Sequence, residues 1–162
     1  MSIPLHQEAP PGKSLRDLGL EAFWFSIHTL LAVLLLVLTL AGMTLTQPDP
    51  ETYAPKILGT VLAFLVPLLG GYLIARIQQN YTARYVWISG ILFFSVLCVW
   101  VLDLPTGSGL CEHCDATQKL WRTFFDITHG SGLLGGDGLL LGTWLPLCLI
   151  AYAIGASFAL ED

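Results

Sequence analysis

Four long stretches without a charged side chain dominate this sequence. They run from Ala22 to Leu45, from Ile57 to Ala75, from Tyr85 to Leu102 and from Leu139 to Leu160. A bilayer hydrocarbon core of roughly 30 Å is crossed by a helix of about 20 apolar residues. The sequence therefore predicts an all-α integral membrane protein, a single membrane domain over residues 1–162, whose four transmembrane helices form a bundle.

The low charge of the chain agrees with this prediction. Charged residues make up 12% of the sequence, whereas soluble domains carry about 25%. A chain that turns most of its surface to membrane lipids does not need charges to cover it. The net charge of -5 gives no basic face for nucleic acid, so we expect no nucleic-acid partner.

Two segments lie outside the apolar stretches. Residues 1–14 are expected to form a flexible tail, after which Ser14 and Asp17 have the spacing of a helix-capping box. Residues 103–138 form the largest loop, in which we expect a short amphipathic helix from about Ala116 to His129. Asp115 and Gln118 would cap its start, and Gly130 would end it. Its apolar side suits the membrane interface or a protein partner, through Leu120, Trp121, Phe124 and Phe125.

Lysine and arginine near the ends of the spans predict the orientation of the chain. One side of the membrane would hold Lys13, Arg16, Arg76 and Arg84, and the other would hold Lys56, Lys119 and Arg122. The short loop between Arg76 and Arg84 contains two arginines and no acid, and most acids lie on the opposite side. We expect both termini in the cytoplasm, and the compact architecture suggests a bacterial inner membrane.

Small residues recur at every fourth position in two of the spans, which keeps them on one helix face. Such stripes let membrane helices approach closely. They would serve packing within the bundle or docking onto another subunit, and the sequence leaves both possibilities open. The residues are Gly59, Ala63, Gly71 and Ala75 in the second span, with Pro67 at the remaining step, and Ala151, Gly155 and Ala159 in the fourth.

His28 is the histidine inside an apolar stretch. Its imidazole is a candidate ligand for a haem iron or a chlorin magnesium, and the alternative is a buried histidine whose polar atoms are satisfied by neighbours. The spans contain no second histidine for a bis-histidine haem site. Cys98 and Cys148, also within spans, are expected to behave as small apolar residues.

Cys111 and Cys114 form a CxxC pair in the loop between the third and fourth spans. A thiol–disulfide exchange site is one interpretation, because the pair precedes a helix start whose dipole favours the thiolate. A zinc site assembled from Cys111, His113, Cys114 and His129 is a second, although the spacing supplies half of the usual pattern. A local structural disulfide, or two unreactive thiols, is the third.

Four spans with a CxxC pair in an outer loop resemble the disulfide-generating quinone reductases of the DsbB and vitamin K epoxide reductase type. The resemblance covers the topology and this one motif. It implies electron transfer through Cys111 and Cys114, but those enzymes relay electrons through a second cysteine pair. The first outer loop of this chain, Thr46 to Lys56, contains no cysteine, so membership of that family is not inferred.

The leading functional hypothesis is a non-catalytic structural or accessory subunit of a larger membrane complex. Its basis is the pair of small-residue faces, the amphipathic loop helix and the lack of charged residues within the spans, where proton and ion pathways usually place them. The first alternative is an outer-face thiol–disulfide oxidoreductase using Cys111 and Cys114. The second is a small transporter that would have to oligomerise to build a pathway.

Overall fold

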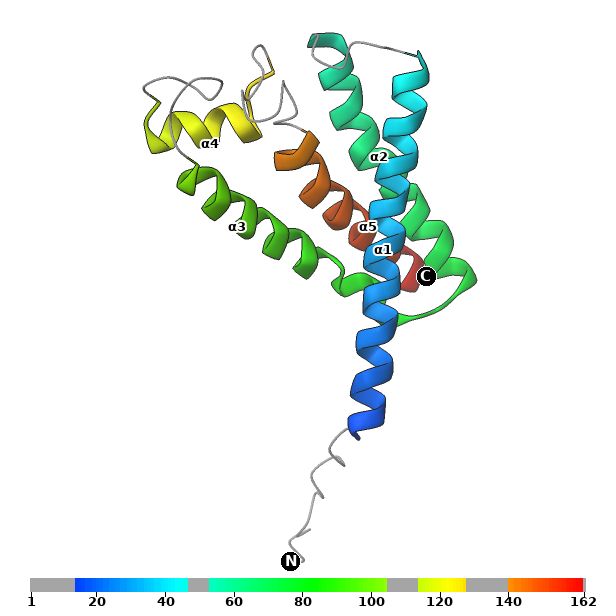
Figure 1. Ribbon diagram of the computed structural model, residues 1–162. Coiled ribbons are helices and arrows are strands. Elements are labelled where there is room, and N and C mark those ends of the chain that lie inside the picture. Colours follow the sequence, from blue (N-terminus) through cyan, green and yellow to red (C-terminus); the bar gives the residue numbers. More distant parts are fainter. Residues whose placement is uncertain (1–13, 47–52, 105–113, 128–139, 162) are drawn as a thin grey trace, which may run out of the picture.

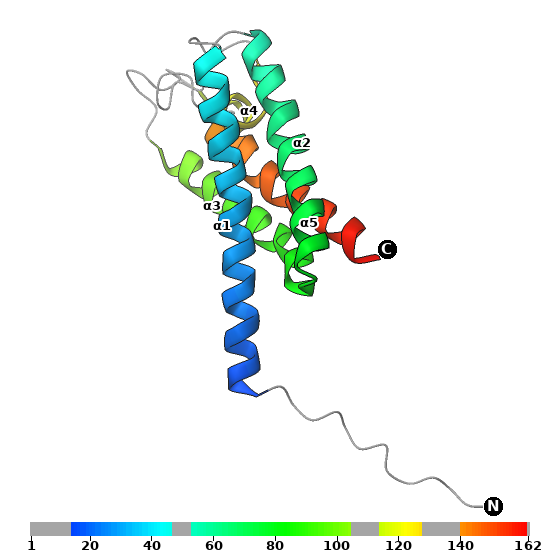
Figure 2. The ribbon, with the colours of Figure 1, turned by 90° about the vertical axis from the view of Figure 1, so that its right-hand side faces the viewer.

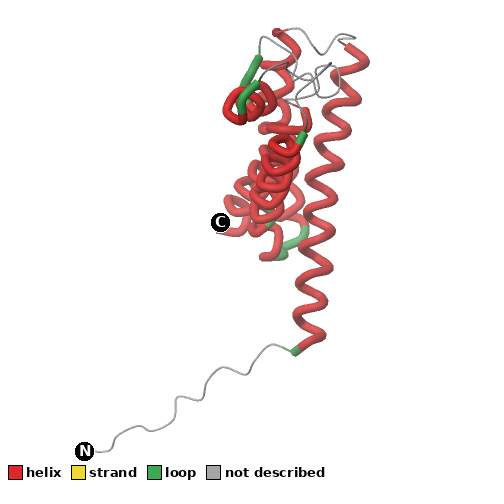
Figure 3. The backbone as a smooth tube through the Cα atoms, turned by 60° about the vertical axis from the view of Figure 1, so that its left-hand side comes forward, coloured by secondary structure: helices red, strands yellow, loops and turns green. Residues whose placement is uncertain are grey.

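A computed structural model describes residues 14–46, 53–104, 114–127 and 140–161. Within these ranges the chain is helical, with short connections and no strand (Figure 3). Four helical segments are long and apolar enough to cross a membrane: Leu15–Thr46, Lys56–Ile77, Tyr81–Asp103 and Gly142–Glu161. The prediction of an all-α bundle with four membrane spans is confirmed. The predicted tail at residues 1–14 lies outside the described residues, apart from Ser14.

Helix α1 (Leu15–Thr46) is 32 residues long, about 48 Å at 1.5 Å per residue. The predicted capping box is present at its start. The Asp17 amide donates to Ser14 Oγ at 3.2 Å, and the Ser14 amide donates to Asp17 Oδ2 at 3.2 Å. The first turns of α1 extend beyond the other helices (Figures 1 and 2), and Leu15 and Phe23 there are exposed.

Helix α2 (Tyr53–Ile77) and helix α5 (Leu145–Glu161) pack closely along their lengths. A Cβ added to Gly71 would overlap the backbone carbonyl of Tyr152, and one added to Gly155 would overlap the carbonyl of Leu68. Backbone therefore touches backbone at this seam, which small residues permit. All the predicted packing residues are buried in this structure: Gly59, Ala63, Gly71, Ala75, Ala151, Gly155 and Ala159.

A short 3₁₀ segment, η1 (Tyr81–Tyr85), connects α2 to helix α3 (Trp87–Asp103). The Asn80 side chain begins it by accepting from the Thr82 amide at 3.0 Å and from the Thr82 hydroxyl at 2.8 Å. Thr82 and Ala83 are buried against the rest of the bundle. This turn therefore holds the start of α3 beside α5, with α5 lying between α3 and α2 (Figure 1).

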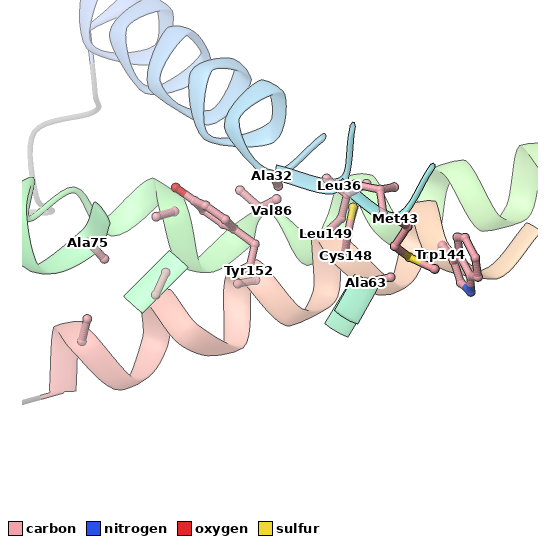
Figure 4. Packing of buried hydrophobic residues seen from close by; sticks show 14 residues of the cluster. Ala32, Leu36, Met43, Ala63, Ala75, Val86, Trp144, Cys148, Leu149 and Tyr152 are labelled. Carbon is pink, nitrogen blue, oxygen red and sulfur yellow. The ribbon is translucent and has the colours of Figure 1, made fainter. Parts of the chain in front are cut away.

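Helix α4 (Ala116–Phe124) lies across the far end of α3, and a π-helical turn, η2 (Leu140–Trp144), leads into α5. The Trp144 ring covers Gly59 of α2, and its indole nitrogen donates to Thr60 Oγ1 at 2.8 Å. The core is a single cluster around α5, to which α1 contributes Ala32, Leu36 and Met43 (Figure 4). The fourth predicted span thus forms the centre of the fold rather than one of four equivalent helices.

Candidate functional site

A buried polar cluster joins three helices inside the bundle. His28 Nδ1 of α1 lies 2.8 Å from the Tyr152 hydroxyl of α5, and both side chains are 0% exposed. The Tyr152 side chain rises from α5 toward α1 (Figure 4). At the next residue of α1, Thr29 Oγ1 lies 3.2 Å from Ser89 Oγ of α3. Each pair satisfies polar groups that would otherwise face hydrocarbon.

His28 Nε2 is buried and has no hydrogen-bond partner in the part of the chain that the structure describes. If Tyr152 donates to Nδ1, Nε2 carries a proton with no acceptor; in the other tautomer, Nε2 is an acceptor with no donor. Nε2 is thus the ring nitrogen left for a haem or chlorin. The ring is nevertheless enclosed, and an axial ligand needs an open face for the macrocycle. A ligand role for His28 remains a prediction.

The CxxC region is described in part. Cys114 is disulfide-bonded and lies directly before Asp115, the residue that caps α4. Cys111, His113 and His129 lie outside the described residues, so neither the redox pair nor the predicted zinc set is seen complete. Among the described residues, no three His, Cys, Asp or Glu side chains gather as a metal site would require.

The two cysteines within spans carry free thiols. Cys98 of α3 is half-buried, and Cys148 of α5 is buried, with its thiol donating to the Leu145 carbonyl at 3.0 Å. Cys148 belongs to the apolar core.

The predicted loop helix is present but shorter than expected. Asp115 Oδ1 accepts from the Gln118 amide at 2.7 Å, so the predicted cap is confirmed, whereas α4 ends at Phe124 instead of about His129. The Thr143 hydroxyl donates to the Phe124 carbonyl at 2.5 Å. This bond from η2 satisfies a carbonyl that a longer helix would have used.

The four predicted docking residues of α4 divide into two kinds. Phe124 is 2% exposed and packs on Phe94 of α3 with ring centroids 4.8 Å apart. Leu120 is half-buried. Trp121 and Phe125 are exposed, and their rings lie 5.3 Å apart. Phe124 therefore fixes α4 to the bundle, while Trp121 and Phe125 face outward together.

Lys119 ties α4 to the end of α3. Its ammonium donates to the Leu104 carbonyl at 2.5 Å and to the Leu102 carbonyl at 3.4 Å. These carbonyls lie at the negative end of the α3 dipole, where a cation is favourable. The sequence placed this lysine in the predicted loop helix, but its contact with the end of α3 could not be predicted from the sequence.

A groove between α3 and α5 was also missed by the sequence reasoning. Near the chain's C-terminal end it has a volume of about 570 Å³ and is bordered by Arg84 and Glu161, whose charged atoms lie 3.8 Å apart. A second, smaller hollow of about 280 Å³ lies farther along the same two helices and ends at Phe94 and Phe124. No periodicity could reveal this feature, because each helix contributes ordinary apolar residues to it.

Comparison of the chain with models of known protein families, with curated proteins and with solved structures finds no match. The function has to be inferred from the side chains and surfaces described above.

Proposed function

We propose that this protein is a non-catalytic accessory subunit of a larger membrane protein complex. The observation that carries the proposal is the start of α1, which remains helical although it stands clear of the bundle (Figure 2). Leu15 is 89% exposed and Leu18 is 48% exposed. They precede the apolar stretch that begins at Ala22, among the charged residues Arg16, Asp17 and Glu21, so this part of α1 emerges from the membrane.

Exposed leucines one turn apart lie on one helix face, where an amphipathic helix commonly contacts the groove of a partner. A short helical extension gains most of its stability from tertiary packing. Leu15 and Leu18 are both exposed in the part of the chain that the structure describes. A partner subunit would supply that packing.

The exposed Trp121–Phe125 pair supports a second contact on the opposite side of the membrane. Aromatic side chains with small conformational freedom are frequent at the centres of interfaces. Phe124 and Lys119 hold α4 rigidly on α3, so the aromatic pair is presented without a large ordering cost on binding.

We propose a bacterial inner membrane protein with both termini in the cytoplasm, and the distribution of basic residues supports this orientation. The start of α1, the end of α2 and η1 lie at the same end of the bundle as the end of α5 (Figure 1) and contain Arg16, Arg76 and Arg84. On the other side, Lys119 is engaged by the carbonyls at the end of α3, so its presence there has a structural reason. The positive-inside rule then favours the side with the arginines as cytoplasmic.

Purification in a mild detergent tests the proposal. We expect the wild-type chain to co-purify with a larger membrane protein at fixed stoichiometry. A variant with Leu15→Ser and Leu18→Ser should lose that partner while keeping its helical content. The matched control is Leu30→Ala, which changes a leucine that is 68% exposed within the span and should keep the partner. A wild-type chain that elutes alone would contradict the proposal.

The disulfide at Cys114 favours a second candidate, a thiol–disulfide oxidoreductase at the face that carries α4. The bond adjoins the start of α4, where the helix dipole stabilises a thiolate after reduction. Cys111→Ser and Cys114→Ser would each abolish exchange with a dithiol substrate under this alternative. If the chain is a subunit, both variants should leave its association with the partner unchanged.

A further inference from the structure

The two hollows on α3 and α5 form one groove. Ile91 of α3 and Ile150 of α5 border both of them. On α5 the lining residues follow helical spacing from Leu147 through Ile150 and Ile154 to Ser157, and residues so spaced lie on one face. The groove therefore runs along a single side of the helix pair.

The two ends of the groove differ in chemistry. Side chains of opposite charge, Arg84 and Glu161, border the end of the groove at the C-terminal end of α5, beside Tyr85 and Trp87. Tyrosine and tryptophan concentrate at the level of lipid headgroups. No charged side chain borders the other end, where Phe94, Phe124 and Phe125 lie. The groove thus changes from polar to apolar with depth, as a phospholipid does.

The length of the larger hollow along α5 also matches one lipid leaflet. From Ile150 to Glu161, α5 rises by about 16 Å at 1.5 Å per residue. Half of a hydrocarbon core of roughly 30 Å is about 15 Å. A molecule with its headgroup at Arg84 and Glu161 would place its acyl chain along the apolar wall down to Ile150.

We propose that this groove binds one phospholipid whose headgroup carries both a phosphate and a primary ammonium. The Arg84 guanidinium would bind the phosphate, and the Glu161 carboxylate would accept hydrogen bonds from the ammonium. At 3.8 Å, Arg84 and Glu161 are close enough to attract each other but beyond hydrogen-bond distance. A zwitterionic headgroup gives each charged group a closer partner of opposite sign.

The charge pattern selects among lipid classes. A choline headgroup has no N–H to donate to Glu161, and an anionic glycerol headgroup offers no cation to it. The headgroup with phosphate and primary ammonium satisfies both side chains, so the groove should prefer phosphatidylethanolamine to phosphatidylcholine and phosphatidylglycerol.

Native mass spectrometry of the full-length detergent-purified chain tests this preference. Equal amounts of the three lipids are added, and the lipid that stays bound is measured. We expect one phosphatidylethanolamine per chain, with retention lowered roughly tenfold, or about 1.4 kcal/mol, in Arg84→Gln and in Glu161→Gln. The matched charge control is Arg76→Gln, which alters an arginine in the last turn of α2 that does not border the groove.

A second variant pair tests the apolar part. Ser157→Phe places a ring in the groove and should reduce retention of all three lipids. Leu92→Phe adds the same ring to α3 at a side chain that is 63% exposed and does not border the groove, and it should not affect retention. Equal retention of the three lipids by the wild-type chain, preference for another class, or unchanged retention in Arg84→Gln and Glu161→Gln would overturn the proposal.

Discussion

Helices α3 and α5 have the same length, but α5 is largely buried within the bundle and α3 is largely exposed on its surface. Each contains 17 residues. In α5 nine residues are buried, including Leu149, Tyr152 and Gly155, whereas in α3 three are buried, Ser89, Gly90 and Val101. The less buried helix, α3, is nevertheless the more hydrophobic of the two. Hydrophobicity therefore does not decide which membrane helix occupies the centre.

Side-chain size accounts for the difference. Lipid tails are as apolar as leucine, so transfer from lipid to a protein interior gives little hydrophobic free energy. Close packing supplies the attraction instead, and it requires backbones to approach. Gly155 and Ala159 of α5 allow this approach, while α3 turns large side chains such as Phe93 and Trp100 outward. The following substitutions sharpen this contrast, from the largest expected effect to the smallest.

Gly155→Leu should have the largest effect. Its side chain would overlap the Leu68 carbonyl and the Tyr72 amide, and backbone atoms cannot move aside without separating α2 from α5. We expect the free energy of unfolding to fall by at least about 3 kcal/mol, measured by denaturation in mixed detergent micelles. The control is Gly42→Leu, at a position with no atom within 4 Å of an added Cβ. Equal stability of the two variants would show that the seam is not closed as described.

Tyr152→Phe should have an intermediate effect, because it leaves His28 Nδ1 buried without its partner. We expect a loss of about 1 kcal/mol. The double variant His28→Leu, Tyr152→Phe should lose less than the sum of the single variants, since no unpaired polar group of the pair then remains. Additive losses in this double-mutant cycle would contradict a direct interaction between the two side chains.

Lys119→Met should have the smallest of these effects. It removes a cation that donates to the Leu102 and Leu104 carbonyls, a contribution of about 0.5–1 kcal/mol. The consequence should be local, with faster amide hydrogen exchange in α4 and little change in α5. Arg122→Met, the control, removes a charge from the same helix. Equal exchange in both variants would argue against a specific role for Lys119.

Much of the fold could be predicted from the sequence, because its signals are local. The length of an apolar stretch determines whether it spans the membrane, and the capping boxes at Ser14 and Asp115 act over three residues. The end of α4 was predicted wrongly because it depends on Thr143, which is distant in the sequence.

The candidate sites depend on contacts that sequence reasoning could not supply. His28 was noticed because it is a histidine in an apolar stretch, but its partner Tyr152 lies 124 residues away. The small-residue stripes were recognised individually, whereas their pairing across α2 and α5 was not. Arg84 and Glu161 lie far apart in the sequence. Because charged residues are common at helix ends, neither residue alone predicts that the two border one groove.

The most direct test of the contrast between α3 and α5 compares one leucine from each helix. Leu149 of α5 is 0% exposed, and Leu92 of α3 is 63% exposed. Both are replaced by alanine, and the free energy of unfolding is measured under the same conditions. We expect Leu149→Ala to cost about 2–5 kcal/mol and Leu92→Ala about 0.5 kcal/mol or less. Similar losses for the two variants would contradict the assignment of α5 as the central helix and α3 as a lipid-facing one.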